Sequence, residues 1–350
     1  MTLKRCFLIF SPLLTVLIIL AGIGIGSVFI SPGQTAAILL HKLAGKDLPE
    51  SIPGTFAGIV WSLRLPRVLL AWITGAALSV SGAVMQSVLK NPLASSFTLG
   101  VSSGASLGAG LVLFFGSAVP FLAFLPAEIV SSVPVPLAGF LFSMLAIAVV
   151  MGFSGAVDPR FSNTTVILSG MVFSLFINAV LTLLSALSRQ EMSRLLFWQM
   201  GSFALKGWSP VVLLFPVVTA GILAVFYFRR EMDILSFSDD DAIAIGVPAG
   251  KIKKILIILA SLLTGFTISF VGVIGFLDLA VPHVVRRIFG PGHRTLIPFS
   301  ALFGGFFMVL ADILARVIIP SLELPVGAIT AVLGTPLFAW IYISSRKRYA

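Results

Sequence analysis

Residues 67–88 read RVLLAWITGAALSVSGAVMQSV, a stretch with no charged residue after Arg67. About 20 apolar residues in a row are enough for a helix to cross the hydrocarbon layer of a membrane. Gly75, Ser79 and Gly82 recur within it at helical spacing, and such small residues let a second helix approach closely in lipid. The stretch therefore predicts a transmembrane helix that packs tightly against another helix.

The composition extends this interpretation to the whole chain. Of the 350 residues, 58% are hydrophobic and 10% are charged, and the mean hydropathy is +1.11. A typical soluble domain has roughly 25% charged residues, so no soluble core could bury this surplus of apolar side chains. The sequence predicts an all-α, polytopic membrane protein that forms one domain over residues 1–350, with the lipid bilayer as its main solvent.

About ten stretches have the length and hydropathy expected of membrane spans. They are residues 7–30, 67–88, 97–116, 134–153, 164–187, 209–228, 253–274, 276–289, 297–319 and 326–344. The eighth stretch is short, contains Pro282 and follows Gly272 and Gly275. We expect it to form a broken helix that is surrounded by protein or by a water-filled cavity.

Basic residues gather at the ends of these stretches. The net charge is +10, but nucleic-acid binding needs a basic face on a folded domain, so no nucleic-acid partner is expected. An N-terminus in the cytoplasm gives the cytoplasmic connections the larger share of Lys and Arg, and an even number of spans returns the C-terminus to the same side. The apolar stretch after Lys4-Arg5 lacks a small-residue cleavage site, so we expect it to be retained as the first span.

Two short stretches resemble each other. TVILSG at 165–170 is followed by Phe173, and ITAVLG at 329–334 is followed by Phe338. If spans two to five are repeated as spans seven to ten, corresponding spans are five apart. Because five is an odd number of membrane crossings, the second copy is inverted in the membrane relative to the first. Inverted repeats of this kind are typical of transporters.

Short motifs of other protein classes lack the context that they need. GVSSG at 100–104 fits the nucleophile elbow of serine hydrolases, but no strand is expected before it and no acidic or histidine partner is evident nearby. An intramembrane serine protease, with a histidine facing Ser102 or Ser103, stays open as an alternative. The chain has no phosphate-binding P-loop sequence, and its single cysteine and three scattered histidines suggest neither a disulfide nor a metal site. No cofactor is expected.

An ordered series of motifs resembles the FecCD family of ABC-importer permeases, which transport iron-siderophores, haem and cobalamin. The series is Arg64–Arg67, Gly75–Gln86, Asn91–Ala94, Leu99–Ala105, Gly201-Ser202, Ala244–Val247, Gly272–Phe276, Val281–His283, Ala311-Asp312, Glu323–Gly327 and Leu333-Gly334. So many ordered matches are more specific than any single motif. The resemblance implies a permease of ten helices in the bacterial inner membrane, with both termini in the cytoplasm, that acts as a homodimer or with a paralogue.

The same resemblance implies two cytoplasmic ATP-binding subunits and a periplasmic substrate-binding protein as partners, so this chain is not expected to be an enzyme. It assigns docking of the binding protein to Arg64, Arg67 and Arg316, and the planar guanidinium suits that task because it pairs bidentately with carboxylates. Interfacial anchoring explains the same residues. For Arg316, so does a local pair with Asp312, four residues earlier on the helix.

The resemblance also places the coupling to the ATPases in the cytoplasmic segment of residues 229–254, at Asp241, Ala242 and Gly246. The acidic residues can cap a short helix and Gly246 can end it. A solvated acidic loop is the alternative interpretation of this segment.

A cytoplasmic gate is implied at two segments, whose residues are Asn91, Leu93, Ser162, Asn163 and Thr164. Small polar groups there can close against their symmetry mates without presenting a fixed charge to a bulky ligand. Turn formation explains the Asn-Pro pair at 91–92 equally well.

The chain departs from the family pattern in two places. Asp278 stands where the family usually has glycine, and Ser95-Ser96 replaces the usual acidic residue. A carboxylate at membrane depth costs roughly 2.5–3.5 kcal/mol unless it is paired or hydrated, so we expect Asp278 to face polar protein or the transport pathway. An ion-coupled secondary transporter, with Asp278 as the coupling residue, is the main alternative function. The sequence does not specify the cargo.

Overall fold

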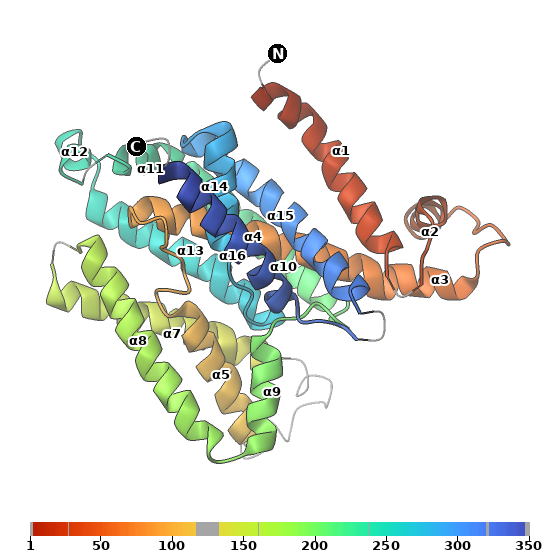
Figure 1. The fold of residues 1–350 in the computed structure, drawn as a ribbon, viewed down its shortest axis with the longest axis horizontal. Coiled ribbons are helices and arrows are strands. Elements are labelled where there is room, and N and C mark those ends of the chain that lie inside the picture. The colour runs from red at the N-terminus through yellow and green to blue at the C-terminus, as the bar shows by residue number, and fades with distance from the viewer. Residues whose placement is uncertain are drawn as a thin grey trace.

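A computed structural model describes residues 3–26, 28–116, 133–159, 161–237, 239–319 and 322–346 of the chain. Within these ranges every regular element is a helix and no strand occurs (Figure 1). By length and hydropathy, six helices of the described residues can cross a membrane, and three shorter apolar helices accompany them. The all-helical membrane architecture predicted from composition is confirmed.

A helix occupies each of the predicted spans. These helices are α1 (Leu3–Gly24), α4 (Leu65–Val88), α5 (Val101–Phe115), α7 (Pro134–Val157), α8 (Asn163–Ser185), α10 (Ser209–Tyr227), α13 (Ala249–Val271), α14 (Leu277–Phe289), α15 (His293–Val317) and α16 (Val326–Arg346). As expected, α14 is short and contains a proline, Pro282. The number of helices that cross the bilayer stays a prediction.

Hydropathy did not reveal the helices between these stretches. They are α2 (Pro32–Ala44), α3 (Gly54–Gly58), a π-helical segment (Ile59–Arg64), α9 (Arg189–Gln199), α11 (Arg229–Leu235) and α12 (Asp239–Ala244). The first expected span, 7–30, ends early, at Gly24, because the chain turns there into α2. Ser31 and Gln34 form a capping box that fixes the start of α2, and Pro32 occupies its first turn.

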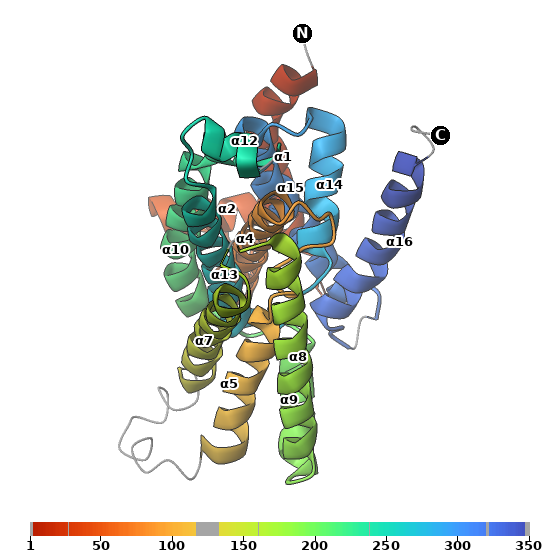
Figure 2. The ribbon, with the colours of Figure 1, turned by 90° about the vertical axis from the view of Figure 1, so that its left-hand side faces the viewer.

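The helix bundle has two ends, which we name by their short helices. The α12 end holds α11, α12 and both termini, and the α2 end holds α2, α3 and α9 (Figure 1). α8 and α16 lie on one face of the molecule (Figure 2).

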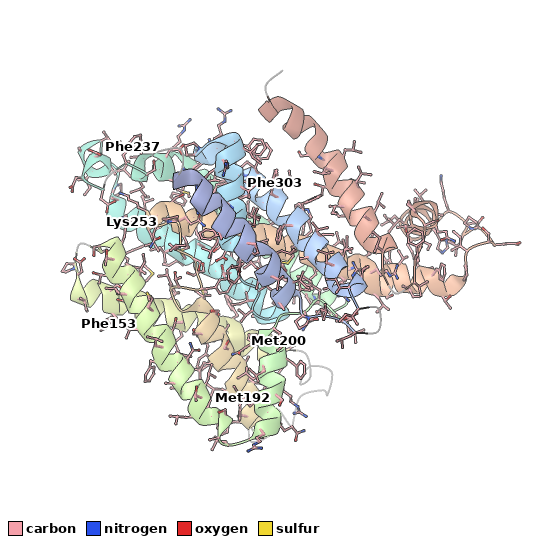
Figure 3. The ribbon with its side chains drawn as sticks, in the orientation of Figure 1. Phe153, Met192, Met200, Phe237, Lys253 and Phe303 are labelled. Carbon is pink, nitrogen blue, oxygen red and sulfur yellow. The ribbon has the colours of Figure 1, made fainter. Side chains whose placement is uncertain are left out.

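The helix α4 lies at the centre and packs against α10, α13, α14 and α15. Nearly all of its residues are buried. Its small residues allow this packing, because a Cβ atom at Gly75 would collide with the carbonyl of Gly304 on α15, and one at Gly82 would collide with that of Asp278 on α14. The close approach predicted from the row of small residues is confirmed, and side chains fill the spaces around it (Figure 3).

The helices α4, α5, α7 and α8 have neighbours that correspond, in the same order, to those of α13, α14, α15 and α16. α4 packs on α15 as α13 packs on α7, and α5 packs on α7 and α8 as α14 packs on α15 and α16. α5 and α14 each follow a residue with left-handed backbone, Gly100 (φ 87°) and Phe276 (φ 68°). In the two similar stretches, a Cβ atom at Gly170 would collide with Leu99 and one at Gly334 with Phe276. Each of these glycines therefore lets its helix pass close to the start of a short helix.

Candidate functional site

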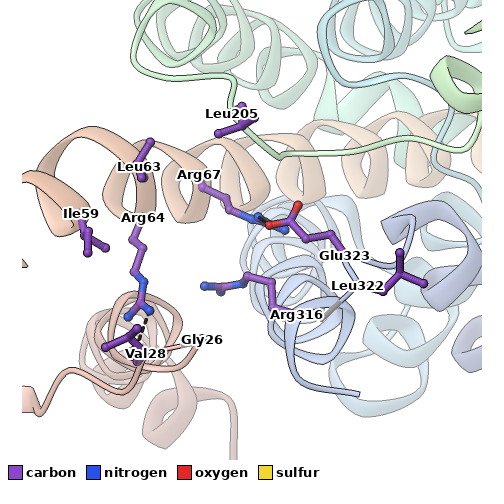
Figure 4. A pocket seen from close by; sticks show the side chains of 10 residues that line it. All are labelled: Gly26, Val28, Ile59, Leu63, Arg64, Arg67, Leu205, Arg316, Leu322 and Glu323. Carbon is purple, nitrogen blue, oxygen red and sulfur yellow. Dashed lines mark hydrogen bonds and ion pairs between the residues drawn. The ribbon is translucent and has the colours of Figure 1, made fainter. Parts of the chain in front are cut away.

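Three arginines converge on a cavity of about 340 Å³ at the α2 end (Figure 4). Arg64 ends the π-helical segment, Arg67 lies in the first turn of α4, and Arg316 lies in the last turn of α15. All three are less than a tenth exposed. The residues predicted to dock a binding protein therefore line one cavity, and their docking role stays a prediction.

Arg64 is bound to the end of α1. Its guanidinium donates to the carbonyls of Ile23 at 2.8 Å and Gly24 at 3.1 Å, and also to that of Val28. The last carbonyls of a helix lack partners within the helix and carry partial negative charge, so an arginine satisfies them well. Gly26 makes room for this arginine, because a Cβ atom there would lie 2.8 Å from a guanidinium nitrogen.

Arg67 and Arg316 share one buried carboxylate. Asp312, whose side chain is fully buried, pairs with Arg67 at 2.8 Å and with Arg316 at 3.0 Å. Arg67 also pairs with Glu323 at 2.9 Å, and the Glu323 side chain is 54% exposed. The local pair that the sequence suggested for Arg316 is present, together with bonds from its guanidinium to carbonyls at the end of α1. Three guanidinium groups meet two carboxylates, so the cluster keeps an excess of positive charge.

At the other end of the bundle, α12 forms a short helix with an acidic first turn. Asp239, Asp240 and Asp241 face the partial positive charge of its N-terminus. Gly246 has φ 86°, and the chain reverses there with a bond of 2.9 Å from the N–H of Val247 to the carbonyl of Ala242. Helix start and helix end thus lie where the sequence indicated, and the coupling role of this segment stays a prediction.

Large apolar side chains are exposed on this segment, beside the exposed Asp240 and Asp241. Ile243 and Ile245 are 61% and 66% exposed, and Phe237, just before α12, is 77% exposed. Ala242 faces inward and is fully buried. Exposed apolar side chains that lie together are typical of interaction surfaces, and such a role for this segment stays a prediction.

A chain of polar contacts runs beneath α12. The carboxylate of Asp239 accepts from Lys90 Nζ at 2.9 Å and also pairs with Lys253. Lys253 Nζ donates in addition to Asn163 Oδ1 at 2.9 Å. Lys253 belongs to α13, and its side chain is only 3% exposed (Figure 3). The contacts therefore connect the end of α4, the short helix α12, α13 and the start of α8.

The two predicted gate segments lie at the two ends of this chain of contacts. Asn91 follows Lys90, and its side chain accepts the N–H of Leu93 at 2.9 Å, so the predicted turn is present. Ser162 caps α8, Asn163 contacts Lys253, and Thr164 is exposed. The structure thus links both segments to α12, and their gating role stays a prediction.

The surroundings of Asp239 set its charge. Partial burial raises its pKa, but hydrogen bonds and charges from Lys253 and Lys90 outweigh burial, so the pKa lies below the ordinary value. Asp239 is therefore ionised at neutral pH.

Asp278 lies in the first turn of α14 and is almost fully buried against α4. Its backbone carbonyl accepts from Gln86 Nε2 at 3.0 Å, whereas neither oxygen of its carboxylate has a hydrogen-bond partner among the described residues. For Asp278, the polar surroundings expected from the cost of a carboxylate in a membrane therefore stay a prediction. Its place on a transport pathway stays a prediction.

Residues 13–344 match the sequence model of the FecCD transport family. The chain belongs to the FecCD transport family. It is 38% identical to an uncharacterized ABC transporter permease protein of Bacillus subtilis, over 94% of this chain and 91% of that protein. It is 37% identical to the cobalamin import system permease protein of Halobacterium salinarum, over 84% of this chain and 76% of that protein.

The fold agrees with this assignment. A solved structure described as an inward-facing conformation of a metal-chelate type ABC transporter has a TM-score of 0.82 and 27% identity, over 97% of this chain and 99% of that one. This FecCD protein is therefore an ABC transporter permease, a transport component and not an enzyme. The alternatives of an ion-coupled transporter and an intramembrane protease are set aside.

Sequence reasoning missed the residues that connect the predicted gate segments to α12 in this FecCD permease. In the sequence, Lys90 and Lys253 lie at the ends of apolar stretches, and Asp239 is the first of three consecutive aspartates. The pairing of Lys90 with Asp239 joins positions 149 residues apart, which no local pattern shows. The sequence offers one signal for the role of Lys90, which is that it directly precedes Asn91 in the first predicted gate segment.

Proposed function

We propose that this permease moves an iron-siderophore, haem, cobalamin or related metal-containing ligand into the cytoplasm after a binding protein delivers it. The FecCD family and the similarity to a cobalamin import permease support this cargo class. The mechanism is supported by contacts that link α12 to both predicted gate segments. Asp239 of α12 pairs with Lys90, next to the first segment, and with Lys253, which binds Asn163 in the second.

The proposed orientation puts the α12 end and both termini in the cytoplasm and the α2 end in the periplasm, with ten spans in the bacterial inner membrane. In this arrangement α4, α5, α7 and α8 form one repeat, and α13, α14, α15 and α16 form a second, inverted one. The corresponding packing partners and the matching positions of Gly170 and Gly334 support the repeat.

In the proposed coupling step, a groove on each of two ATP-binding subunits receives Phe237, Ile243 and Ile245. Closure of the ATPases displaces α12, and the Asp239 carboxylate transmits the displacement because it holds ammonium groups on two other elements. Lys90 then moves the segment of Asn91, and Lys253 moves the start of α8. Both gate segments therefore respond to one helix.

The coupling surface is tested by Ile243→Glu, which places a charge on the exposed apolar surface without disturbing the buried Ala242. We expect the variant to fold and to lose co-purification of the ATP-binding subunits. Leu205→Glu is the matched control, because Leu205 is 90% exposed at the α2 end. Equal retention of the ATPases by the two variants would refute the proposed surface.

At the periplasmic end we propose that carboxylates of the binding protein enter the cavity of Arg64, Arg67 and Arg316. The excess positive charge of the cluster and the shape of the guanidinium groups favour this partner. Arg67 offers one nitrogen to Glu323, which is half exposed, so an incoming carboxylate can displace Glu323 while the buried Asp312 stays bound.

We propose that α8 faces a cavity shared with a second permease copy or a paralogue. Leu168, Met171 and Leu175 are exposed on α8, and the amide of Asn178 is exposed on the same side, one turn further along. An unpaired amide within a span is costly in lipid, so this side faces water or protein.

Labelling with a membrane-impermeant maleimide tests this assignment. In a Cys6→Ser background, we expect Asn178→Cys to react in the assembled transporter. Leu145→Cys on α7, at a position that is 53% exposed and that we expect to face lipid, should stay unlabelled. Equal labelling at both positions would show that α8 faces lipid as α7 does.

A further inference from the structure

A second group of arginines surrounds a cavity of about 370 Å³ at the α12 end, where α10, α11 and α15 meet. Its lining residues are Phe226, Arg229, Arg230, Asp233 and Arg294. The cavity is separate from the coupling surface of α12 and from the arginine cluster at the α2 end.

The partners of these residues leave positive charge unbalanced. Arg229 is held in place, because it donates to the carbonyl of Phe226 at 3.1 Å and its guanidinium lies 4.7 Å from the centre of the Phe226 ring. Asp233 accepts from the backbone N–H of His293 at 2.9 Å and contacts its ring at 2.6 Å. Arg230 and Arg294 are exposed, and neither forms an ion pair within the part of the chain that the structure describes. The cavity therefore suits an anionic group.

An apolar groove lies along α10, the helix that also contributes to the basic cavity, and is nearer the α2 end. It has a volume of about 530 Å³ between α1, α4 and α10, and it is lined by Thr15, Ile19, Leu69, Trp72, Ile73, Val211, Val212 and Phe215. Phe215 and Phe226 are 226 − 215 = 11 residues apart on α10, which corresponds to about 16 Å along a helix. This length is close to half of the roughly 30 Å hydrocarbon layer, the depth that one acyl chain fills.

We propose that the basic cavity and the apolar groove bind one anionic phospholipid. Its phosphate lies between Arg230 and Arg294, and one acyl chain follows α10 into the groove beside α1. Leu223 and Tyr227, which are 62% and 72% exposed on α10 near the cavity, mark this region as the lipid interface. Basic cavities between membrane helices bind anionic headgroups through the same chemistry.

The inference goes beyond the proposed transport function, because lipid binding requires neither ATPase nor cargo. A free phosphate would use the arginines but not the groove, and a zwitterionic lipid would use the groove but gain less from the arginines. An anionic phospholipid uses both.

Native mass spectrometry of the detergent-purified permease tests the headgroup. We expect dioleoyl phosphatidylglycerol to bind more tightly than dioleoyl phosphatidylcholine. In the variant Arg230→Gln with Arg294→Gln, the ratio of these two affinities should fall roughly tenfold or more. Lys251→Gln is the matched control, because it removes an exposed cation elsewhere at the α12 end. A preference that is absent in the wild type, or unchanged in the double variant, would overturn the proposal.

Two further measurements separate the other occupants. If inorganic phosphate raises the melting temperature as much as phosphatidylglycerol does, the site takes a free anion and not a lipid. If the double variant keeps its lipid preference but no longer binds the ATP-binding subunits, the arginines belong to the ATPase interface. Either result contradicts the proposal.

The groove is tested by Val212→Trp, which fills its mouth at a position that is 65% exposed. We expect weaker binding of dioleoyl phosphatidylglycerol and unchanged binding of dihexanoyl phosphatidylglycerol, whose chains are too short to reach the groove. Unchanged binding of the long-chain lipid would show that the acyl chain lies elsewhere.

Discussion

The two ends of the permease each hold a network of ion pairs, built on arginines at the α2 end and on lysines at the α12 end. At the α2 end, buried guanidinium groups are held by the fully buried carboxylate of Asp312 and by the carbonyls of α1. At the α12 end, the central carboxylate of Asp239 is 38% exposed and joins separate elements under an exposed apolar surface. Burial favours a first network that stays fixed, whereas we propose that the second network transmits the movement of α12, because one carboxylate holds two other elements.

The largest effect is expected from Arg67→Ala at the α2 end. The substitution leaves the buried carboxylate of Asp312 with less compensating charge, and breaking a buried pair costs about 3–5 kcal/mol of unfolding free energy. Denaturant unfolding in detergent measures this loss. Arg194→Ala is the control, because Arg194 is 58% exposed in its pair with Glu191 and its loss should cost at most about 1 kcal/mol. Equal losses in the two variants would remove the distinction between a buried and an exposed network.

A smaller effect, on coupling, is expected from Lys253→Met at the α12 end. The variant keeps an unbranched side chain of similar length but cannot bind Asp239 and Asn163 together. We expect ATP hydrolysis to continue while uptake per ATP falls roughly two- to thirtyfold, the range of a coupling change of about 0.5–2 kcal/mol. Lys251→Met, at an exposed position on the same helix, should leave the ratio unchanged. A normal ratio in Lys253→Met would mean that these contacts do not transmit motion.

The next effect concerns the one exposed carboxylate of the α2 cluster. Glu323→Gln should raise the affinity of the binding protein up to about fivefold, because it releases a guanidinium nitrogen of Arg67 from an exposed ion pair. Surface plasmon resonance with the purified partners measures the change. Glu191→Gln removes a negative charge from α9 at the same end and should change the affinity less. An unchanged or lower affinity in Glu323→Gln would show that Glu323 does not compete with the partner.

The smallest effect is the pH dependence of the α12 network. Asp239 has a lowered pKa in the folded protein, so its contribution to stability is present above the ordinary aspartate pKa and is lost as the pH falls through the lowered one. The difference in unfolding free energy between wild type and Asp239→Asn should therefore be constant near pH 7 and shrink below about pH 4. It should stay under about 1 kcal/mol, because the carboxylate is partly exposed. A difference that grows on acidification would have the wrong sign for this pairing.

Much of the fold was predictable from the sequence, because a membrane span requires a long apolar stretch and few charges. The short helices were not predictable in this way. α2 begins at a capping box of Ser31 and Gln34, and the π-helical segment ends at Arg64, whose position depends on carbonyls of α1. Hydropathy reports neither capping nor contacts between distant residues.

The candidate site was predictable in its composition but not in its connections. The family resemblance indicated Arg64, Arg67 and Arg316, and they share a cavity. It did not show that Asp312 binds two of them, because the pairing with Arg67 spans 245 positions. Lys253 has the sequence context of an ordinary interfacial cation, and only the tertiary fold shows it buried among polar partners.

ATP dependence of uptake tests the central claim, that this permease takes its driving force from separate ATP-binding subunits. The purified permease is reconstituted in proteoliposomes with those subunits and the binding protein, and entry of a radiolabelled iron chelate is followed. The predicted result is uptake that requires ATP and stops when the P-loop lysine of the ATP-binding subunits is replaced. Uptake of equal rate with that replacement, driven by an ion gradient alone, would contradict the claim.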